Sequence, residues 1–400
     1  MSLIVQKFGG SSVADTERLF NVADIVTSTY ARGDDVVVVV SAQGDTTDDL
    51  IEKAKEINPN PSKREMDVLL ANGEQISISL LAMAIEKLGY PVISLTGWQA
   101  GIHTGMNYGA ARIKKVDTER LKLEISKRRI VIVAGFQGIN RFDDITTLGR
   151  GGSDTTAVAL AAALGADLCQ IYTDVDGVYT ADPRKIPTAK KLDEITYDEM
   201  LELASLGAQV LHNRSVEMGK RFNVDMEVIS SFTRNPGTKI KEAHKVEKMN
   251  VSGVARDMDI AQISLVNMAD APGIAYKVFS TLANKGVNVD IILQSTGRND
   301  AKDIAFTVPS SSIELAKKVL EENKDSIGFE DIKVREDLCK LSIVGAGMVN
   351  NPGVAAMMFE ALAAANVNID MISTSEIKVS VLIAKEDSER AMRAVHDKFF

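Results

Sequence analysis

The chain of 400 residues is poor in the residue types that mark several protein classes. Two cysteines, Cys169 and Cys339, cannot form a disulfide framework, and the four histidines show no metal-ligand spacing. The longest apolar run, near residues 157–166, is about half a membrane span. The amino terminus has no basic segment followed by an apolar core, so no signal peptide is expected. We therefore expect a cytoplasmic protein with no membrane partner.

Positive charge is also scarce. Lys and Arg number 46 against 55 Asp and Glu, which gives a formal net charge of −9. Because nucleic-acid binding needs a basic face, nucleic acid is excluded as the main partner. With 45% apolar and 25% charged residues, the composition is that of an ordinary globular protein. The length suggests roughly two to three domains.

The first half of the chain alternates short apolar runs with helical patterns. The run from Val36 to Val40 is valine throughout, which indicates a strand covered on both faces. Strands are expected at 3–7, 36–41, 91–96, 130–134 and 168–173, with helices at 16–30, 64–88, 117–127 and 155–164. This alternation predicts an α/β fold, with a mostly parallel sheet sandwiched by helices. Ligands of such sheets bind at the carboxyl ends of the strands.

Glycines and small hydroxyl residues follow several of these strands, as in Gly9-Gly10 after Lys7 and in Gly151-Gly152-Ser153 before the last helix. Glycine lets backbone N–H groups approach phosphate oxygens, so this edge suits a nucleotide. Lys7 can place its charge between transferring phosphates, and Arg150 can clamp a carboxylate. Asp154 and Asp174 could orient that lysine or hold magnesium. Taken singly, each motif could be a tight turn or a capped helix start, and no Walker A pattern occurs.

The second half contains an internal repeat at an offset of 80 residues. Residues 271–290 align with 351–370 without a gap, and Pro272/Pro352, Gly273/Gly353 and Asp290/Asp370 are identical pairs. Each copy is expected to form a ferredoxin-like βαββα unit whose first helix begins at the proline. The first copy has a final strand near 331–335, which the second lacks. We expect the strand at 249–257 to complete the second copy, so that the two copies interleave in sequence.

These motifs resemble those of the monofunctional aspartokinase family. The residues that carry the resemblance are Lys7-Phe-Gly-Gly-Ser-Ser, Ser41-Ala-Gln-Gly-Asp-Thr-Thr-Asp, Arg150-Gly-Gly-Ser-Asp-Thr-Thr-Ala and 173–184. The repeat resembles the paired ACT domains of that family. The resemblance implies an amino-acid-kinase (carbamate-kinase-like) catalytic domain at 1–245, a first ACT module at 263–337 and a second at 338–400.

The resemblance also implies the reaction and its ligands. The enzyme would make 4-phospho-L-aspartate from L-aspartate with ATP and Mg²⁺, as the first step toward lysine (diaminopimelate), threonine and methionine. Lysine, threonine or both would inhibit it through the ACT modules. A homo-oligomer is expected, either a dimer or a tetramer, or pairing with a shorter ACT-only chain that starts at Met249.

The site residues implied by the resemblance fall into four groups. Lys7 and Asp154 would be catalytic. The ATP-binding residues would be Lys7, Phe8, Gly9, Gly10, Ser41, Thr173, Asp174, Tyr179, Arg184 and Gln209. The aspartate-binding residues would be Thr47, Glu74, Arg150, Gly151 and Ser153. The effector-binding residues would be Asn288, Val289, Asp290, Gln294, Val354, Ala355, Asn368, Ile369, Thr374 and Ser375. No resident metal site is expected.

Three positions depart from the family pattern. Gln209 stands where the family has a lysine, Asn213 replaces a common proline, and Gln43 replaces a common methionine. Gln209 can donate a hydrogen bond to phosphate but brings no charge, so the departure puts the rate in doubt. Two other interpretations stay open: an amino-acid-binding regulatory protein with a degenerate kinase half, and a kinase of another small carboxylate such as acetylglutamate. No residues are left for a homoserine dehydrogenase fusion.

Overall fold

The computed structural model describes residues 1–206, 210–242, 251–295, 301–348, 351 and 353–400. The chain divides into two compact units. The first unit comprises Met1–Tyr179, Lys190–Ser205 and Gln209–Val246. The second unit comprises Thr180–Ala189, Leu206–Ala208 and Glu247–Phe400. The chain therefore enters the second unit after Tyr179 and returns to the first at Lys190.

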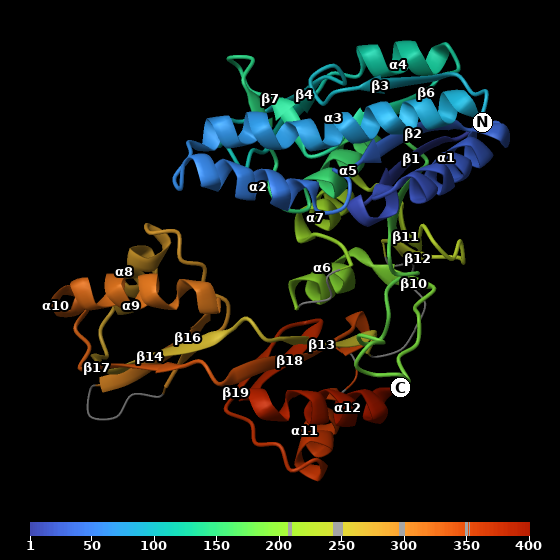
Figure 1. Ribbon diagram of the computed structural model, residues 1–400. Coiled ribbons are helices and arrows are strands. Elements are labelled where there is room, and N and C mark those ends of the chain that lie inside the picture. Colours follow the sequence, from blue (N-terminus) through green and yellow to red (C-terminus); the bar gives the residue numbers. More distant parts are fainter. Residues whose placement is uncertain (207–209, 243–250, 296–300, 349–350, 352) are drawn as a thin grey trace. The chain divides into compact units, whose positions relative to one another are not determined.

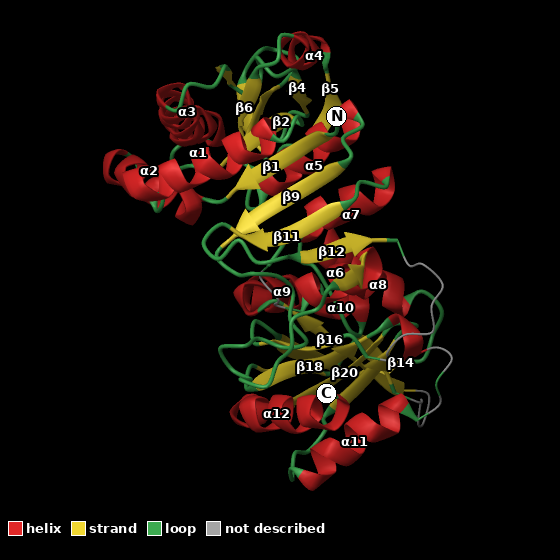
Figure 2. Cartoon of the chain, turned by 90° about the vertical axis from the view of Figure 1, so that its right-hand side faces the viewer, coloured by secondary structure: helices red, strands yellow, loops and turns green. Residues whose placement is uncertain are grey.

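The first unit is built on an eight-stranded sheet (Figure 1). Its strands are β1 (Leu3–Phe8), β2 (Asp35–Val40), β3 (Val92–Leu95), β6 (Ile130–Ala134), β9 (Leu168–Thr173), β10 (Glu194–Thr196), β11 (Met226–Ser230) and β12 (Thr238–Lys241). Their order is β10-β12-β11-β9-β1-β2-β6-β3, and every neighbouring pair is parallel except β11 and β12. Figure 2 shows β1, β9, β11 and β12 side by side. The predicted α/β fold with a mostly parallel sheet is confirmed.

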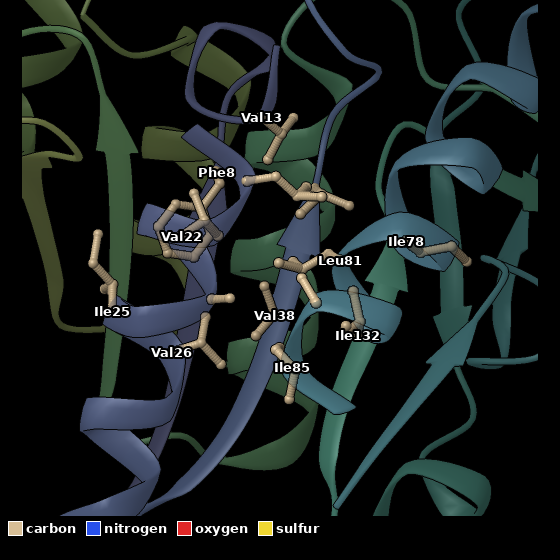
Figure 3. Packing of buried hydrophobic residues seen from close by; sticks show 14 of the residues in the cluster. Phe8, Val13, Val22, Ile25, Val26, Val38, Ile78, Leu81, Ile85 and Ile132 are labelled. Carbon is tan, nitrogen blue, oxygen red and sulfur yellow. The ribbon is translucent and has the colours of Figure 1, made fainter. Parts of the chain in front are cut away.

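Helices cover both faces of this sheet. They are α1 (Thr16–Ala31), α2 (Thr46–Ile57), α3 (Lys63–Lys87), α4 (Glu119–Ser126), α5 (Gly152–Leu164), α6 (Tyr197–Ser205) and α7 (Asn213–Phe222). Val38 of β2 packs with Leu81 and Ile85 of α3 in one buried cluster, which also includes residues of α1 (Figure 3). Because successive strand residues point to opposite faces, Val37 and Val39 are buried on the other side, which α5 covers.

Among the described residues, α3 is the one helix long and apolar enough to cross a membrane by length and composition. Its side chains Ile78, Leu81 and Ile85 are buried in the cluster against the sheet. Burial of this kind is typical of a core helix in a folded domain. α3 therefore serves as a rigid support on which further side chains of the first unit are placed.

A second, smaller sheet belongs to the first unit. Its strands are β4 (Ile102–Thr104), β5 (Ile113–Val116), β7 (Gln137–Ile139) and β8 (Ile145–Thr147), in the order β5-β4-β7-β8. The sequence analysis did not predict this sheet, because strands of three or four residues show no readable periodicity. β8 leads through a short turn into α5, so the small sheet positions the residues at 148–151.

The second unit contains two modules, each with a four-stranded antiparallel sheet. We call β14 (Ala261–Ala269), α8 (Ile274–Ala283), β15 (Ile292–Gln294), β16 (Ala301–Val308), α9 (Ile313–Glu322), α10 (Lys324–Ile327) and β17 (Asp331–Arg335) the first module. The second module comprises β13 (Gly253–Asp257), β18 (Leu338–Val344), α11 (Val354–Ala364), β19 (Met371–Thr374), β20 (Lys378–Ala384) and α12 (Ser388–Phe399). The strand orders are β15-β16-β14-β17 and β13-β18-β20-β19. β13, which precedes the first module in sequence, thus pairs with β18 of the second (Figure 1).

The helix starts of the two modules differ from the expectation. α8 begins at Ile274 after Gly273, whose φ is 90°, and α11 begins at Val354 after Gly353, whose φ is 102°. The expectation that each helix begins at its proline is therefore wrong for α8, and Pro352 lies outside the described residues. A left-handed residue, which glycine adopts without steric cost, separates Pro272 from the helix.

The segment Thr180–Ala189 packs within the second unit, although it lies inside the range expected for the catalytic domain. Ala181 and Ile186 belong to the buried cluster of the second module. The Thr180 carbonyl accepts a hydrogen bond of 2.7 Å from the Val254 N–H, and Lys185 pairs with Glu389 at 3.2 Å. Thr180–Ala189 is therefore anchored on the second module by both backbone and side-chain contacts.

Candidate active site

The carboxyl ends of β1 and β2 meet at one edge of the large sheet. The Ser41 N–H donates to the Phe8 carbonyl at 3.1 Å, and the Gly44 N–H donates to the Gly10 carbonyl at 3.1 Å. A Cβ at Gly10 would lie 2.6 Å from the Ala42 carbonyl oxygen, a distance that no side chain tolerates. The two loops therefore fit together only because position 10 is glycine.

Lys7 and Asp154 form an ion pair at this edge. The Lys7 Nζ lies 2.7 Å from Asp154 Oδ1, and the two side chains are 12% and 13% exposed. Lys7 is the second-last residue of β1, whereas Asp154 lies in the first turn of α5. A Cβ at Gly9 would stand 3.5 Å from the Lys7 Nζ, so the bare glycine backbone leaves room beside the ammonium group. This arrangement can present a positive charge to an anion held by the glycine loop.

β9 brings two further predicted residues to the same edge, because it is the other neighbour of β1. The Thr173 hydroxyl donates to Asp174 Oδ1 at 3.0 Å, and Asp174 is exposed. The Tyr179 hydroxyl donates to Asp176 at 2.7 Å, which raises the pKa of Tyr179 to about 12. Tyr179 therefore stays a neutral hydrogen-bond donor at physiological pH.

A pocket of about 490 Å³ contains two of the five residues expected to bind aspartate, Thr47 and Arg150. It is lined by Thr47, Asp48, Ile51, Lys63, Met66, Asp67, Leu70, Tyr108, Gly109, Ala110, Phe136, Thr147, Gly149 and Arg150. Arg150 itself is exposed. Gly151 ends the turn with a φ of 69°, and a Cβ there would lie 2.3 Å from the His212 ring, so only glycine fits. Ser153 is buried in the first turn of α5.

Glu74 is a buried carboxylate on α3 whose two oxygens differ in their hydrogen bonding. It is 3% exposed, and the Ala42 N–H donates to Oε1 at 3.1 Å. Oε2 has no hydrogen-bond partner among the described residues. Burial in an apolar environment raises the pKa of Glu74 to about 7. A cationic group that reached Oε2 would stabilise the ionised form.

Two predicted nucleotide residues lie outside the described part of the first unit. Arg184 lies in Thr180–Ala189 of the second unit, where its guanidinium pairs with Asp182 at 3.0 Å. Gln209 lies outside the described residues. The roles of both remain predictions.

The second unit holds a pocket at four of the predicted effector positions. This pocket of about 490 Å³ lies in the second module and is lined by Met348, Asn351, Gly353, Val354, Ala355, Thr374, Ser375, Glu376 and Val379. The sequence analysis missed Glu376, the one acidic residue in this lining. Val289 and Ile369 pack against the cores of their modules, while Asn288, Gln294 and Asn368 are exposed.

Asp290, another predicted effector residue, is already paired. Lys340 of β18 lies with its Nζ 2.5 Å from Asp290 and 3.6 Å from Asp257 of β13. Asp370, the equivalent residue of the second copy, pairs with Arg335 at 2.7 Å. Each of these aspartates therefore contacts a cation that lies on a strand of the other module, Lys340 on β18 and Arg335 on β17.

Comparison with known proteins places the chain in a family. Residues 2–230 match the amino acid kinase family, and residues 263–323 and 341–399 match the ACT domain. Aspartokinase 2 of Bacillus subtilis (strain 168) is 51% identical over 400 residues, which cover 100% of this chain and 98% of that protein. The chain therefore belongs to the amino acid kinase family. Within it the chain groups with the aspartokinases, and it is an enzyme with aspartate kinase activity.

Solved structures agree with this assignment. The structure of E. coli aspartokinase III in complex with aspartate and ADP (R-state) is similar with a TM-score of 0.83, at 26% identity, over 100% of both chains. The structure of aspartokinase III in complex with lysine and aspartate (T-state) has a TM-score of 0.76 at 27% identity, over 100% of this chain and 99% of the other. The fold and the ACT-domain architecture predicted from sequence are thus confirmed.

Proposed function

We propose that the enzyme transfers the γ-phosphoryl group of MgATP to the side-chain carboxylate of L-aspartate. A carboxylate oxygen of aspartate forms the new bond to phosphorus, while the bond from phosphorus to the β–γ bridging oxygen breaks and ADP leaves with that electron pair. No proton needs to move, so no general base is required. The product is 4-phospho-L-aspartate. The observation that carries the proposal is the Lys7–Asp154 pair, which α5 connects to the pocket holding Arg150.

On the phosphate side, Lys7 stabilises the charge that spreads over the transferring oxygens. Asp154 holds the ammonium group in place, since their atoms are 2.7 Å apart. Backbone N–H groups at Gly9 and Gly10 complete the phosphate site. The rest of the nucleotide would be surrounded by Phe8, Ser41, Thr173, Asp174 and Tyr179. Arg184 and Gln209 would be further contacts. Mg²⁺ enters with ATP as part of the substrate.

On the aspartate side, Arg150 binds the α-carboxylate, because a guanidinium group can donate two parallel hydrogen bonds to it. The unpartnered Oε2 of Glu74 accepts from the α-ammonium group. Thr47, Gly151 and Ser153 supply hydrogen bonds that fix the orientation. In this arrangement both recognition groups bind the α-carbon end of the substrate, and the side-chain carboxylate remains free for transfer.

For regulation, we propose that lysine, threonine or both bind at the ACT modules and inhibit the kinase. The pocket of the second module supports this, because it combines hydroxyl groups of Thr374 and Ser375 with the Glu376 carboxylate. An amino-acid ligand offers an ammonium group to such acceptors. The remaining contacts would come from the other predicted effector residues, which are Asn288, Val289, Asp290, Gln294, Asn368 and Ile369. The aspartokinase III structure with lysine gives the precedent for lysine.

We also propose the organisation of the enzyme. The catalytic domain spans 1–245, the first ACT module 263–337, and the second 338–400 with the strand at 249–257. The enzyme is a cytoplasmic homo-oligomer, a dimer or tetramer, or pairs with a shorter ACT-only chain. It catalyses the first step toward lysine, threonine and methionine.

The test is product formation with purified enzyme, MgATP and L-aspartate. An acyl phosphate reacts with hydroxylamine to a hydroxamate, so hydroxamate and ADP should appear in equal amounts. N-acetylglutamate in place of aspartate should give neither. ADP release that lysine or threonine suppresses would support the regulatory role. ADP release without hydroxamate would contradict the proposed acceptor, and turnover with N-acetylglutamate alone would contradict the proposed substrate.

A further inference from the structure

Arg150 sits in a glycine-flanked turn that is closed by a backbone hydrogen bond of 2.9 Å from the Gly152 N–H to the Gly149 carbonyl. Residues 148–151 connect β8 to α5, and Arg150 lies between two glycines with left-handed backbones. The φ of Gly149 is 78° and that of Gly151 is 69°. Glycine on both sides of a residue gives the chain its widest conformational freedom. A guanidinium group that must meet a carboxylate in fixed geometry therefore needs support from outside the turn.

Asp67 of α3 supplies support on one side. It is 0% exposed, and both of its oxygens accept from the Gly109 N–H, at 3.0 and 2.9 Å. The Thr147 N–H donates to Oδ2 at 2.9 Å, and the Thr147 hydroxyl donates to Oδ1 at 2.6 Å. One carboxylate thus ties the last residue of β8 to the loop at 109–111.

Arg214 of α7 supplies support on the other side. One guanidinium nitrogen donates to the Leu148 carbonyl at 2.8 Å, and the other donates to the Ala111 carbonyl at 2.7 Å. The Ala111 N–H also donates to the Thr147 carbonyl at 2.9 Å. An anion that accepts from N–H groups and a cation that donates to carbonyl groups therefore clamp the same two segments, immediately before Arg150.

The number of hydrogen bonds that Asp67 accepts distinguishes it from a residue that binds substrate. Asp67 and Glu74 are seven residues apart on α3, hence on one face of the helix, and both are buried. Among the residues that the structure describes, Glu74 has one oxygen with no partner, whereas each oxygen of Asp67 accepts from two donors. Asp67 has no acceptor capacity left for a ligand, although it borders the pocket that contains Arg150.

We propose that Asp67 and Arg214 are positioning residues that hold Arg150 in the geometry needed for the α-carboxylate of aspartate. This inference rests on the proposed role of Arg150 in binding that carboxylate. The clamp acts on the aspartate side of the reaction only, because neither residue hydrogen-bonds to the Lys7 loop in the contacts described above. Loss of the clamp leaves Arg150 present but misplaced.

The first test is a double-mutant cycle on the full-length enzyme. Asp67→Asn puts an N–H donor against N–H donors, and we expect the KM for aspartate to rise about tenfold, with the KM for ATP within about twofold of wild type. In the Arg150→Ala background, Asp67→Asn should add less than about twofold, because the residue it positions is gone. Effects that multiply in the double variant would overturn the inference.

Two further variants keep the test decisive. Arg214→Lys keeps the charge but lacks the planar fork, so it should raise the aspartate KM selectively and serves if Asp67→Asn does not fold. Glu199→Gln is the matched control, because Glu199 is also buried and accepts from the N–H and hydroxyl of Thr196. Its KM values should not change. If Arg150→Ala leaves the aspartate KM unchanged, the proposed function of Arg150 fails; if it raises that KM while Asp67→Asn and Arg214→Lys do not, only the clamp fails.

Discussion

Each unit of the enzyme holds a nearly buried lysine that pairs with aspartate, and the two pairs differ in what surrounds them. In the described part of the chain, the Lys7 ammonium has one carboxylate partner, Asp154, and a bare glycine loop beside it. The Lys340 ammonium lies between two carboxylates, Asp290 and Asp257, and its side chain is 7% exposed. An ion pair between lysine and aspartate can therefore have a different role in each unit.

The two lysines differ in whether the ammonium group can still bind a further anion. A lysine with a single anionic partner and open backbone beside it can still bind a phosphate, since the pair carries no net charge. A lysine between two carboxylates carries an excess of negative charge around it and would bind another cation before an anion. Charge type alone did not distinguish these two lysines; the number of partners and the free space beside each one does.

The largest effect is expected from removing the charge of the first pair. Lys7→Met should lower kcat by about 10³-fold, because a positioned cation at the transferring phosphoryl group is lost. The aspartate KM should change little. ADP release measures both values, and Lys55→Met, which changes an exposed lysine on α2, is the control. Turnover of Lys7→Met near the wild-type rate would remove the contrast between the two pairs.

The second prediction concerns Glu74, whose carboxylate can still accept a hydrogen bond from a ligand. Glu74→Gln should raise the aspartate KM about 100-fold, because a neutral amide replaces the anion that meets the ammonium group. Since the pKa of Glu74 is about 7, the group is mostly protonated at pH 6 and mostly ionised at pH 8. In wild type, kcat/KM for aspartate should therefore fall about tenfold from pH 8 to pH 6. Initial rates across this range, with ATP saturating, measure the fall.

The pH profile of the variant provides the control for this assignment. Glu74→Gln has no carboxyl group to titrate at this position, so the limb near pH 7 should disappear from its profile. If the limb persists in Glu74→Gln, another group is responsible. If aspartate binds equally well at pH 6 and pH 8, Glu74 does not meet the ammonium group.

A third prediction concerns the space beside Lys7. Gly10→Ala should raise the KM for ATP about tenfold, because its Cβ would lie 2.6 Å from the Ala42 carbonyl and displace the phosphate loop. Gly105→Ala is a matched control, since its Cβ would meet only the end of the Lys114 side chain, at 3.4 Å, and the Arg112 carbonyl, at 3.8 Å. Equal ATP affinity of the two variants would show that the loop tolerates a side chain at position 10.

The smallest effect is expected at the second pair. Lys340→Met releases Asp290, so a positively charged effector group meets less competition for that carboxylate. The uninhibited rate should stay within about twofold of wild type, and the half-inhibitory concentration of lysine or threonine should fall about threefold. Inhibition curves at fixed substrate measure the shift. A loss of inhibition would instead mean that Lys340 is needed to hold the two modules together.

Much of this arrangement follows from local sequence patterns. The five apolar runs of the first half became β1, β2, β3, β6 and β9, because an uninterrupted valine run such as Val36–Val40 suits only a strand covered on both faces. The repeat predicted two modules because duplicated sequence folds into duplicated structure. Lys7, Gly9 and Gly10 could be proposed as phosphate-site residues because glycine after a strand is a local pattern typical of phosphate binding.

Other features were hidden from that analysis. The small sheet has strands too short for a readable period. Asp67 and Arg214 belong to no motif, because their partners, mostly backbone groups, lie far away in sequence. Thr180–Ala189 contains two prolines and three charged residues, so nothing in its composition predicts that Ala181 and Ile186 are buried in the second module.

The sequence by itself determined which segments form strands and helices, where the duplicated modules lie, and which side chains are candidates for the chemistry, because each depends on neighbours within a few residues. Only the tertiary structure decided how those side chains are used. Contacts between residues distant in the chain decide how many carboxylates pair with Lys7. They also decide whether both oxygens of a carboxylate on α3 accept hydrogen bonds, as in Asp67, or whether one remains available, as in Glu74. The unit that a segment joins depends on such contacts as well. Burial and hydrogen-bond partners are properties of the packed molecule, and they determine the function of each charge.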